Sequence, residues 1–310
     1  MLRRLMFSQT PYDVGTTYGV VLYFVERKRM FKEDEPMTDK SSIFEQIAER
    51  NAEINARIED AARRSGRSKN DVLLTAVSKY AEPGDGVVEG FLRSGIYDLA
   101  ENRPQKLLEK VSYWNRSPLE NVSSTRSFIS ANERSAEDVP VLRWHFIGNL
   151  QRNKARRILP YVSLIHSVDS WKLLETLERI LQEESERLCL LNEPSFSSTV
   201  SVLLEAHISD DVSKQGIALQ EIESLFPRAF ELKHVKVCGL MGMAGLTATV
   251  DETRRQFASL RKALERIQSL YPEIKYFREL SMGMSGDFEI AIEEGATIVR
   301  IGSSLYPKRS

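Results

Sequence analysis

Side chains with chemical potential follow several short apolar stretches of the sequence, and the first of them is a lysine. Lys79 comes directly after the mostly apolar residues 73–78. Burial at a strand end would lower the pKa of its amine, because desolvation disfavours the ammonium form, and a neutral amine can form a Schiff base. The alternative is a lysine whose ammonium group extends from the strand end into solvent. For Lys79 taken alone, this second interpretation is the stronger one.

An anion site is indicated near the C-terminal end of the sequence. Arg300 provides a cation, Gly302 lets backbone amides approach an anion, and Ser303 adds a hydroxyl beside them. Ser281 lies upstream and precedes a predicted helix, whose N-terminus favours negative charge. The alternative is that the glycines only form turns and that Ser285 caps this helix. A reactive lysine together with a phosphate site indicates a phosphorylated aldehyde, and pyridoxal phosphate is the obvious candidate.

The histidines give weaker evidence. His145, His166 and His207 fall at the ends of three different predicted strands, so a metal site is geometrically conceivable. The one clear carboxylate at these strand ends, Asp169, is better placed as the N-cap of the next helix. We therefore predict no metal site.

Short apolar segments alternate with longer amphipathic segments along most of the chain. The predicted strands are residues 73–78, 97–100, 143–148, 164–168, 200–206, 235–240, 279–282 and 297–301. The predicted helices lie near 84–94, 104–114, 152–159, 170–187, 214–225, 251–270 and 285–294. This alternation predicts a single (β/α)8 TIM barrel, with residues 41–65 as an extra N-terminal helix; a doubly wound open sheet usually needs fewer strands. Phosphate sites in barrels commonly follow strands seven and eight, which is where Ser281 and Arg300 fall.

Composition excludes several classes of protein. The 310 residues carry 43 Lys+Arg and 44 Asp+Glu, so the net charge of −1 argues against a nucleic-acid partner. No apolar run reaches the roughly 18–20 residues of a membrane span. The two distant cysteines, Cys189 and Cys238, argue against a disulfide scaffold and fit a reducing cytoplasm. We predict that residues 1–36 are a tail, that residues 37–310 form the barrel, and that residues 116–140 are a surface insertion.

Several motifs in this order resemble the YggS/PROSC family of pyridoxal phosphate homeostasis proteins over about residues 41–306. They are AVSK (76–79), ENR (101–103), HFIGNLQRNK (145–154), SKQG (213–216), LSMGMS (280–285) and RIGS (300–303). The resemblance implies a barrel of the alanine racemase N-terminal-domain type, with pyridoxal phosphate held as a Schiff base on Lys79. It also implies a set of pocket residues: the phosphate cradle Ser281, Arg300, Gly302 and Ser303, then Asn102 near the cofactor ring, and His145 close to the pocket.

The function that the resemblance implies is intracellular pyridoxal phosphate homeostasis without established catalysis, with pyridoxal phosphate-dependent apo-enzymes as recipients. The chain departs from the usual family pattern at Tyr80, where threonine is typical, at Ala100, where glycine is common, and at His207, where asparagine is usual. These departures leave cofactor binding in place and affect only the finer pocket geometry.

Two other functions use the same lysine. The first is a racemase or decarboxylase, for which Tyr80 and His207 are the available proton-transfer groups. Racemases of this barrel type bring a second β domain, for which the chain has no room after the last strand, and the lack of that dimerising domain favours a monomer. The second is a Schiff-base aldolase acting on a sugar phosphate, but its lysine more usually comes from a late strand.

Overall fold

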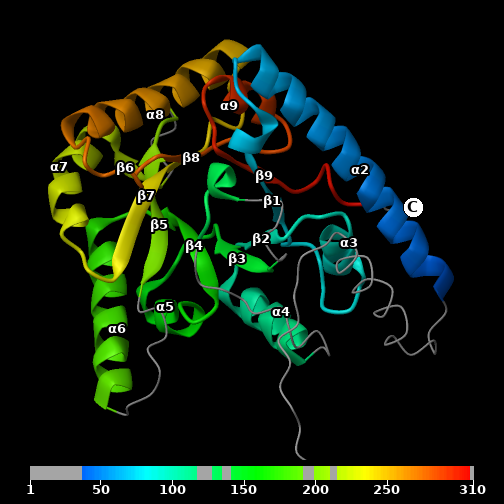
Figure 1. Cartoon of the computed structure of the whole chain (residues 1–310), viewed down its shortest axis with the longest axis horizontal. Helices are drawn as coiled ribbons and strands as arrows, with labels where there is room; N and C mark the ends of the chain where they lie inside the picture. Colours follow the sequence, from blue (N-terminus) through cyan, green and yellow to red (C-terminus); the bar gives the residue numbers. More distant parts are fainter. Residues whose placement is uncertain (1–36, 117–127, 135–140, 191–198, 210–214, 308–310) are drawn as a thin grey trace, which may run out of the picture. The chain divides into compact units, whose positions relative to one another are not determined.

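The computed structural model of the protein describes residues 37–116, 128–134, 141–190, 199–209 and 215–307 (Figure 1). Contacts divide the chain into two units, Met1–Ser41 and Ser42–Ser310. Of the first unit, only residues 37–41 are described, and they begin helix α2 (Met37–Arg64). The predicted tail at residues 1–36 lies outside the described residues.

A closed barrel of parallel strands forms the second unit. Of the nine strands in the described residues, all except the two-residue β6 make the ring, in the order β1-β2-β3-β4-β5-β7-β8-β9, and β9 pairs back with β1. The ring strands are β1 (Leu73–Val77), β2 (Asp98–Glu101), β3 (Arg143–Phe146), β4 (Val162–Val168), β5 (Val200–His207), β7 (Val235–Gly242), β8 (Glu279–Ser281) and β9 (Ile298–Ile301). The predicted (β/α)8 TIM barrel is therefore confirmed.

Helices lie outside the strands in Figure 1 and cover the outer face of the barrel. They are α3 (Val87–Arg93), α4 (Pro104–Arg116), α5 (Arg152–Ile158), α6 (Trp171–Leu190), α7 (Leu219–Phe230), α8 (Val250–Leu270) and α9 (Phe288–Glu293), with 3-10 turns η1 (Lys69–Asp71) and η2 (Ala131–Glu133). No helix within the described ranges is long and apolar enough to cross a membrane. The strands are short and apolar because both of their faces are buried, one by the helices and one inside the barrel.

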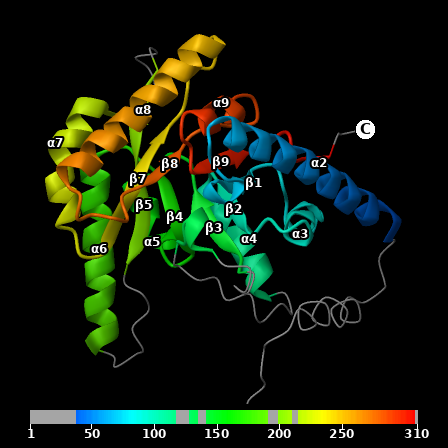
Figure 2. The same ribbon diagram turned by 45° about the horizontal axis from the view of Figure 1, so that its top comes forward.

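The extra N-terminal helix closes the helical layer between α9 and α3. Its apolar face, which includes Ile47, Ile54 and Ile58, is buried. Arg57 on α2 donates two hydrogen bonds to Glu289 on α9, at 3.1 and 2.8 Å, and Figure 2 shows these two helices side by side. As predicted from its helical pattern, α2 covers the gap that the other helices leave.

One predicted helix begins later than expected. The sequence pattern predicted a helix over residues 214–225, but Ile217–Ala218 form strand β6, which pairs with the end of β5, and the helix is α7. Gly216 permits this pairing, because its φ is +128° and a Cβ atom there would lie 2.7 Å from the backbone nitrogen of His207. A two-residue strand is too short to produce a recognisable pattern.

Residues 128–134 lie at the N-terminal end of the barrel. Arg134 donates to the carboxylate of Asp98, the first residue of β2, at 2.6 and 2.9 Å. Ser130 Oγ donates at 2.5 Å to Glu279, the first residue of β8, and Phe128 packs against the apolar cluster inside the barrel. The prediction of a surface insertion is therefore wrong for these residues; residues 117–127 and 135–140 lie outside the described part.

Candidate cofactor-binding site

Lys79 lies two residues beyond the end of β1, beside the loop that follows β9. Ala76 on β1 pairs with Ile301 on β9, which places the turn carrying Lys79 next to Gly302. Lys79 itself is exposed, and its Nζ lies 4.9 Å from the ring centroid of Tyr80. Of the two interpretations of Lys79 taken alone, the structure agrees with the solvent-exposed one, which was the stronger.

A buried arginine and a buried serine occupy neighbouring strands at this end of the barrel. Arg300 on β9 donates through Nη1 to Ser281 Oγ on β8 at 2.6 Å. It also donates through Nη2 to the carbonyl oxygen of Gly242 on β7 at 3.3 Å. Burial lowers the pKa of Arg300 to about 10, opposed by Asp287 and Glu205, so the guanidinium remains charged at neutral pH. The structure thus brings a cation to the end of three adjacent strands.

Backbone amides of the loop after β9 converge beside this cation. The amides of Gly302 and Ser304 both donate to Ser285 Oγ, at 3.3 and 3.5 Å, and Ser303 between them is exposed. Ser285 does not cap the following helix, because α9 begins at Phe288, with Asp287 at the N-cap position. Two amides aimed at one hydroxyl oxygen can also bind an oxygen of an anion.

His145 lies inside the barrel rather than at its open end. Its Nε2 lies 3.2 Å from Asp98 Oδ1, and its Nδ1 lies 3.0 Å from Nε2 of His166. His166 Nδ1 in turn lies 2.8 Å from Ser281 Oγ. A continuous chain of hydrogen bonds therefore crosses the barrel from β2 to Arg300, and His145 reaches the cradle only through His166 and Ser281.

Protonation within this chain follows from burial and from the fixed donors. Burial lowers the pKa of both His145 and His166, and for His166 the neighbouring His145 and Arg300 lower it further. Burial alone would raise the pKa of Asp98, but hydrogen bonds from Arg134 and His145 hold it well below its usual range. The carboxylate can only accept, so His145 donates through Nε2, His166 donates through Nε2, and the Ser281 hydroxyl donates to His166 Nδ1. Both rings are then neutral and fully hydrogen-bonded.

Both ring nitrogens of His145 and of His166 therefore already have hydrogen-bond partners, and none of them is left to bind a metal ion. Among the residues that the structure describes, no group of three or more His, Cys, Asp or Glu side chains could hold a metal ion. Asp169 is not the N-cap that the sequence predicted: Ser170 Oγ accepts from the backbone amide of Leu173 at 3.3 Å, and Ser170 donates to Asp169 at 3.1 Å.

Asn102 follows β2 and is half-buried. Its backbone amide donates to Glu101 Oε1 at 2.8 Å, and its carbonyl oxygen lies against Gly148, where a Cβ atom would come within 1.9 Å. The loops after β2 and β3 therefore touch backbone to backbone. This explains the glycine in the motif that begins at His145, since any side chain there would displace Asn102.

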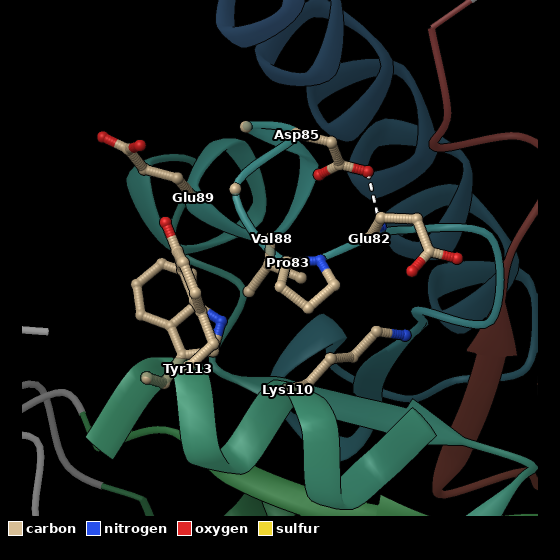
Figure 3. Close-up of a pocket in the computed structure, with 10 residues that line it drawn as sticks. Glu82, Pro83, Asp85, Val88, Glu89, Lys110 and Tyr113 are labelled. Carbon is tan, nitrogen blue, oxygen red and sulfur yellow. Dashed lines mark hydrogen bonds between the residues drawn. The ribbon is translucent and has the colours of Figure 1, made fainter. Parts of the chain in front are cut away.

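A second lysine, which sequence analysis missed, supports the turn carrying Lys79. Lys110 on α4 is fully buried and donates to the carbonyl oxygen of Ser78 at 2.5 Å and to the carboxylate of Glu101. Helical spacing was the available signal, because Lys110 lies three residues after Leu107 and one before Val111, and both of these are buried. Figure 3 shows Lys110 beneath the loop that carries Glu82 and Asp85, in a pocket that none of the predicted site residues lines.

Glu205, also missed from the sequence, is a buried carboxyl on β5 near Arg300. Burial raises the pKa of this carboxyl from 4.5 to about 7. The nearby Asp169 adds to this increase, and Arg300 opposes it. Its signal was the one carboxylate in the mostly apolar strand Val200–His207.

This raised pKa predicts how stability depends on pH. The folded state holds the Glu205 proton more tightly than the unfolded chain, so stability falls as pH rises from about 4.5 to 7, and the full cost is present above 7. A shift of this size corresponds to about 3 kcal/mol. We expect the free energy of unfolding of Glu205→Gln, measured in urea, to increase progressively relative to that of the wild type from pH 5 to pH 8. The exposed control Glu273→Gln should show no such trend; a parallel pH dependence for both variants would contradict the assignment.

The residues at this end of the barrel fit a phosphorylated aldehyde. One exposed primary amine lies beside a loop whose amides converge on a single oxygen, and a buried guanidinium lies on the adjacent strand. An amine supplies the covalent attachment, and the amides with the arginine supply charge-assisted hydrogen bonds to a phosphate.

Comparison with known proteins agrees with this chemistry. Residues 52–309 match the alanine racemase N-terminal domain family. A pyridoxal phosphate homeostasis protein of Aquifex aeolicus (strain VF5) is 32% identical over 263 residues, which cover 84% of this chain and 97% of that protein. One of Pseudomonas aeruginosa is 33% identical over 263 residues, covering 85% of this chain and 96% of that protein. The chain belongs to the pyridoxal phosphate homeostasis protein family.

A solved structure of this family carries the cofactor. PipY of Synechococcus elongatus PCC7942 with pyridoxal phosphate bound superposes with a TM-score of 0.62 at 31% sequence identity, covering 84% of this chain and all of that one (100%). The resemblance noted from the sequence motifs is thus confirmed at the level of the family and the fold.

Proposed function

We propose that this pyridoxal phosphate homeostasis family member binds pyridoxal phosphate at the C-terminal end of its barrel, with Lys79 as the covalent anchor. The observation that carries the proposal is the adjacency of that lysine to the converging amides of Gly302 and Ser304, through the pairing of β1 with β9. When bound, pyridoxal phosphate supplies an aldehyde that condenses reversibly with a primary amine and releases water.

The other residues hold and orient the cofactor. The amides of Gly302 and Ser304, with the exposed Ser303, bind phosphate oxygens in place of the Ser285 hydroxyl. Arg300 and Ser281 carry positive charge and a hydroxyl to the same strand ends, and Asn102 borders the ring. The Ser281 hydroxyl donates its proton to the Asp98–His145–His166 chain, so its oxygen accepts from Arg300 and orients that guanidinium.

Equilibrium dialysis of the purified protein against pyridoxal phosphate, in parallel with pyridoxal, tests the proposal. We expect one pyridoxal phosphate per chain with a visible absorption band, and binding of pyridoxal at least about tenfold weaker, because it lacks the charged group that the cradle binds. Absence of a band and of bound ligand would contradict the proposal. Equal affinity for the two compounds would contradict a phosphate-binding role for the cradle.

The biological role we infer is buffering or delivery of the cofactor to pyridoxal phosphate-dependent apo-enzymes in the cytoplasm, by a monomer. Both cysteines are free, Cys189 exposed and Cys238 buried, which supports a reducing compartment. The racemase or decarboxylase alternative is separated by amino-acid turnover: consumption or racemisation of an amino acid by the loaded protein would favour the enzyme.

A further inference from the structure

The hydroxyl of Tyr306 bridges the two sides of the turn that carries Lys79. It donates to the carbonyl oxygen of Val77 at 3.1 Å and accepts from the backbone amide of Tyr80 at 3.3 Å. Lys79 lies between these two bonded backbone groups. A side chain 226 residues away in the sequence from Tyr80 therefore fixes the backbone immediately before and after the turn.

Aromatic contacts hold Tyr306 in that position. Its ring meets the fully buried Phe91 edge-on at a centroid distance of 5.7 Å, and meets Tyr80 edge-on at 5.9 Å. The Tyr80 ring in turn lies under the ammonium group of Lys79. Burial raises the pKa of the Tyr306 phenol, so its hydroxyl keeps its proton at neutral pH and can donate. Phe91, Tyr306 and Tyr80 thus form a continuous set of aromatic contacts between the core and Lys79.

We propose that Tyr306 is a positioning residue for Lys79, whose hydroxyl presets the turn from which the lysine reaches the cofactor. This inference rests on the proposed function, because it assigns Tyr306 to the same site. A turn already fixed loses less conformational freedom when Lys79 becomes attached, so the hydroxyl strengthens covalent binding in particular. Tyr80, which stands where the resembled family typically has threonine, contributes the backbone amide and the ring.

Tyr306→Phe tests the inference, since it keeps the ring contacts and removes only the hydroxyl. The ligands are pyridoxal phosphate and pyridoxamine phosphate, which has an amine in place of the aldehyde and cannot bond to Lys79. A positioning role predicts affinity for pyridoxal phosphate about fivefold weaker than in the wild type, with affinity for pyridoxamine phosphate unchanged. Tyr276→Phe, which removes a hydroxyl that has no contact with this turn, should change neither.

Hydrogen exchange of the ligand-free proteins provides an independent measurement. We expect faster exchange of the Tyr80 amide in Tyr306→Phe and wild-type exchange in Tyr276→Phe. Unchanged affinity for pyridoxal phosphate, an equal loss for both ligands, or an unchanged Tyr80 amide would each overturn the positioning role. If the wild type binds neither ligand, the proposed function fails, while the exchange experiment still decides whether the hydroxyl fixes the turn.

Discussion

Lys79→Ala is expected to abolish the visible absorption band of the pyridoxal phosphate-loaded protein and to weaken retention of the cofactor by at least about a hundredfold. The reason is chemical: Lys79 carries an exposed primary amine beside the Gly302 loop, whereas the ammonium of the nearby Lys110 is buried against Glu101. The fold should remain intact, because Lys79 is exposed and its ammonium group lies over the ring of Tyr80 at the surface, so the free energy of unfolding should stay within about 0.5 kcal/mol of the wild type.

Lys69→Ala is the matched control for this experiment. Lys69 is also an exposed lysine, but it precedes β1 instead of following it, at the opposite end of the barrel. It should retain both the band and the cofactor. A band that survives in Lys79→Ala would show that another lysine anchors the cofactor, and a band lost in both variants would show that its loss is not specific to Lys79.

Lys110→Met should produce the largest loss of stability, about 3–5 kcal/mol of the free energy of unfolding. The Lys110 ammonium is fully buried, and its removal leaves the carboxylate of Glu101 buried without a cation and the Ser78 carbonyl without this donor. Ser78 immediately precedes Lys79, so we also expect weaker binding of pyridoxal phosphate by the part of the protein that still folds. Chemical denaturation followed by circular dichroism measures the first effect.

Lys106→Met separates this buried pair from ordinary surface charge. Lys106 lies on the same helix and contacts Glu82 and Glu109 at 2.9 and 3.1 Å, but on the surface, so its loss should cost much less stability than the loss of Lys110. Adding Glu101→Gln to Lys110→Met removes the stranded charge and should recover part of the lost stability. Equal costs for the two lysine variants would contradict the structural role of Lys110.

Most of the barrel could be predicted because its strands are buried on both faces. Residues 200–206 and 235–240, for example, are almost continuous apolar runs, and the observed strands extend each by only one or two residues. Strand β6 could not be found, since two residues carry no period. The position of Ser130 and Arg134 at the bottom of the barrel depends on contacts with Glu279 and Asp98, which no local pattern encodes.

The site could be predicted where the chemistry follows strand order. Ser281, Arg300 and Gly302 end neighbouring strands, so the barrel itself brings them together. The residues that were missed do not lie at strand ends. Lys110 contacts the turn from helix α4, and Tyr306 contacts it from the C-terminal segment. His145 was expected close to the pocket, but its position in β3 directs it into the interior, toward a partner histidine.

Reduction of the pyridoxal phosphate-loaded wild-type protein with borohydride, followed by mass mapping of its peptides, tests the central claim most directly. Reduction makes the link between cofactor and amine permanent, so the modified lysine can be identified. The account predicts one added pyridoxyl phosphate per chain, on the peptide that contains Lys79. An unmodified Lys79 with the label on another lysine, or no label on any peptide, would contradict it.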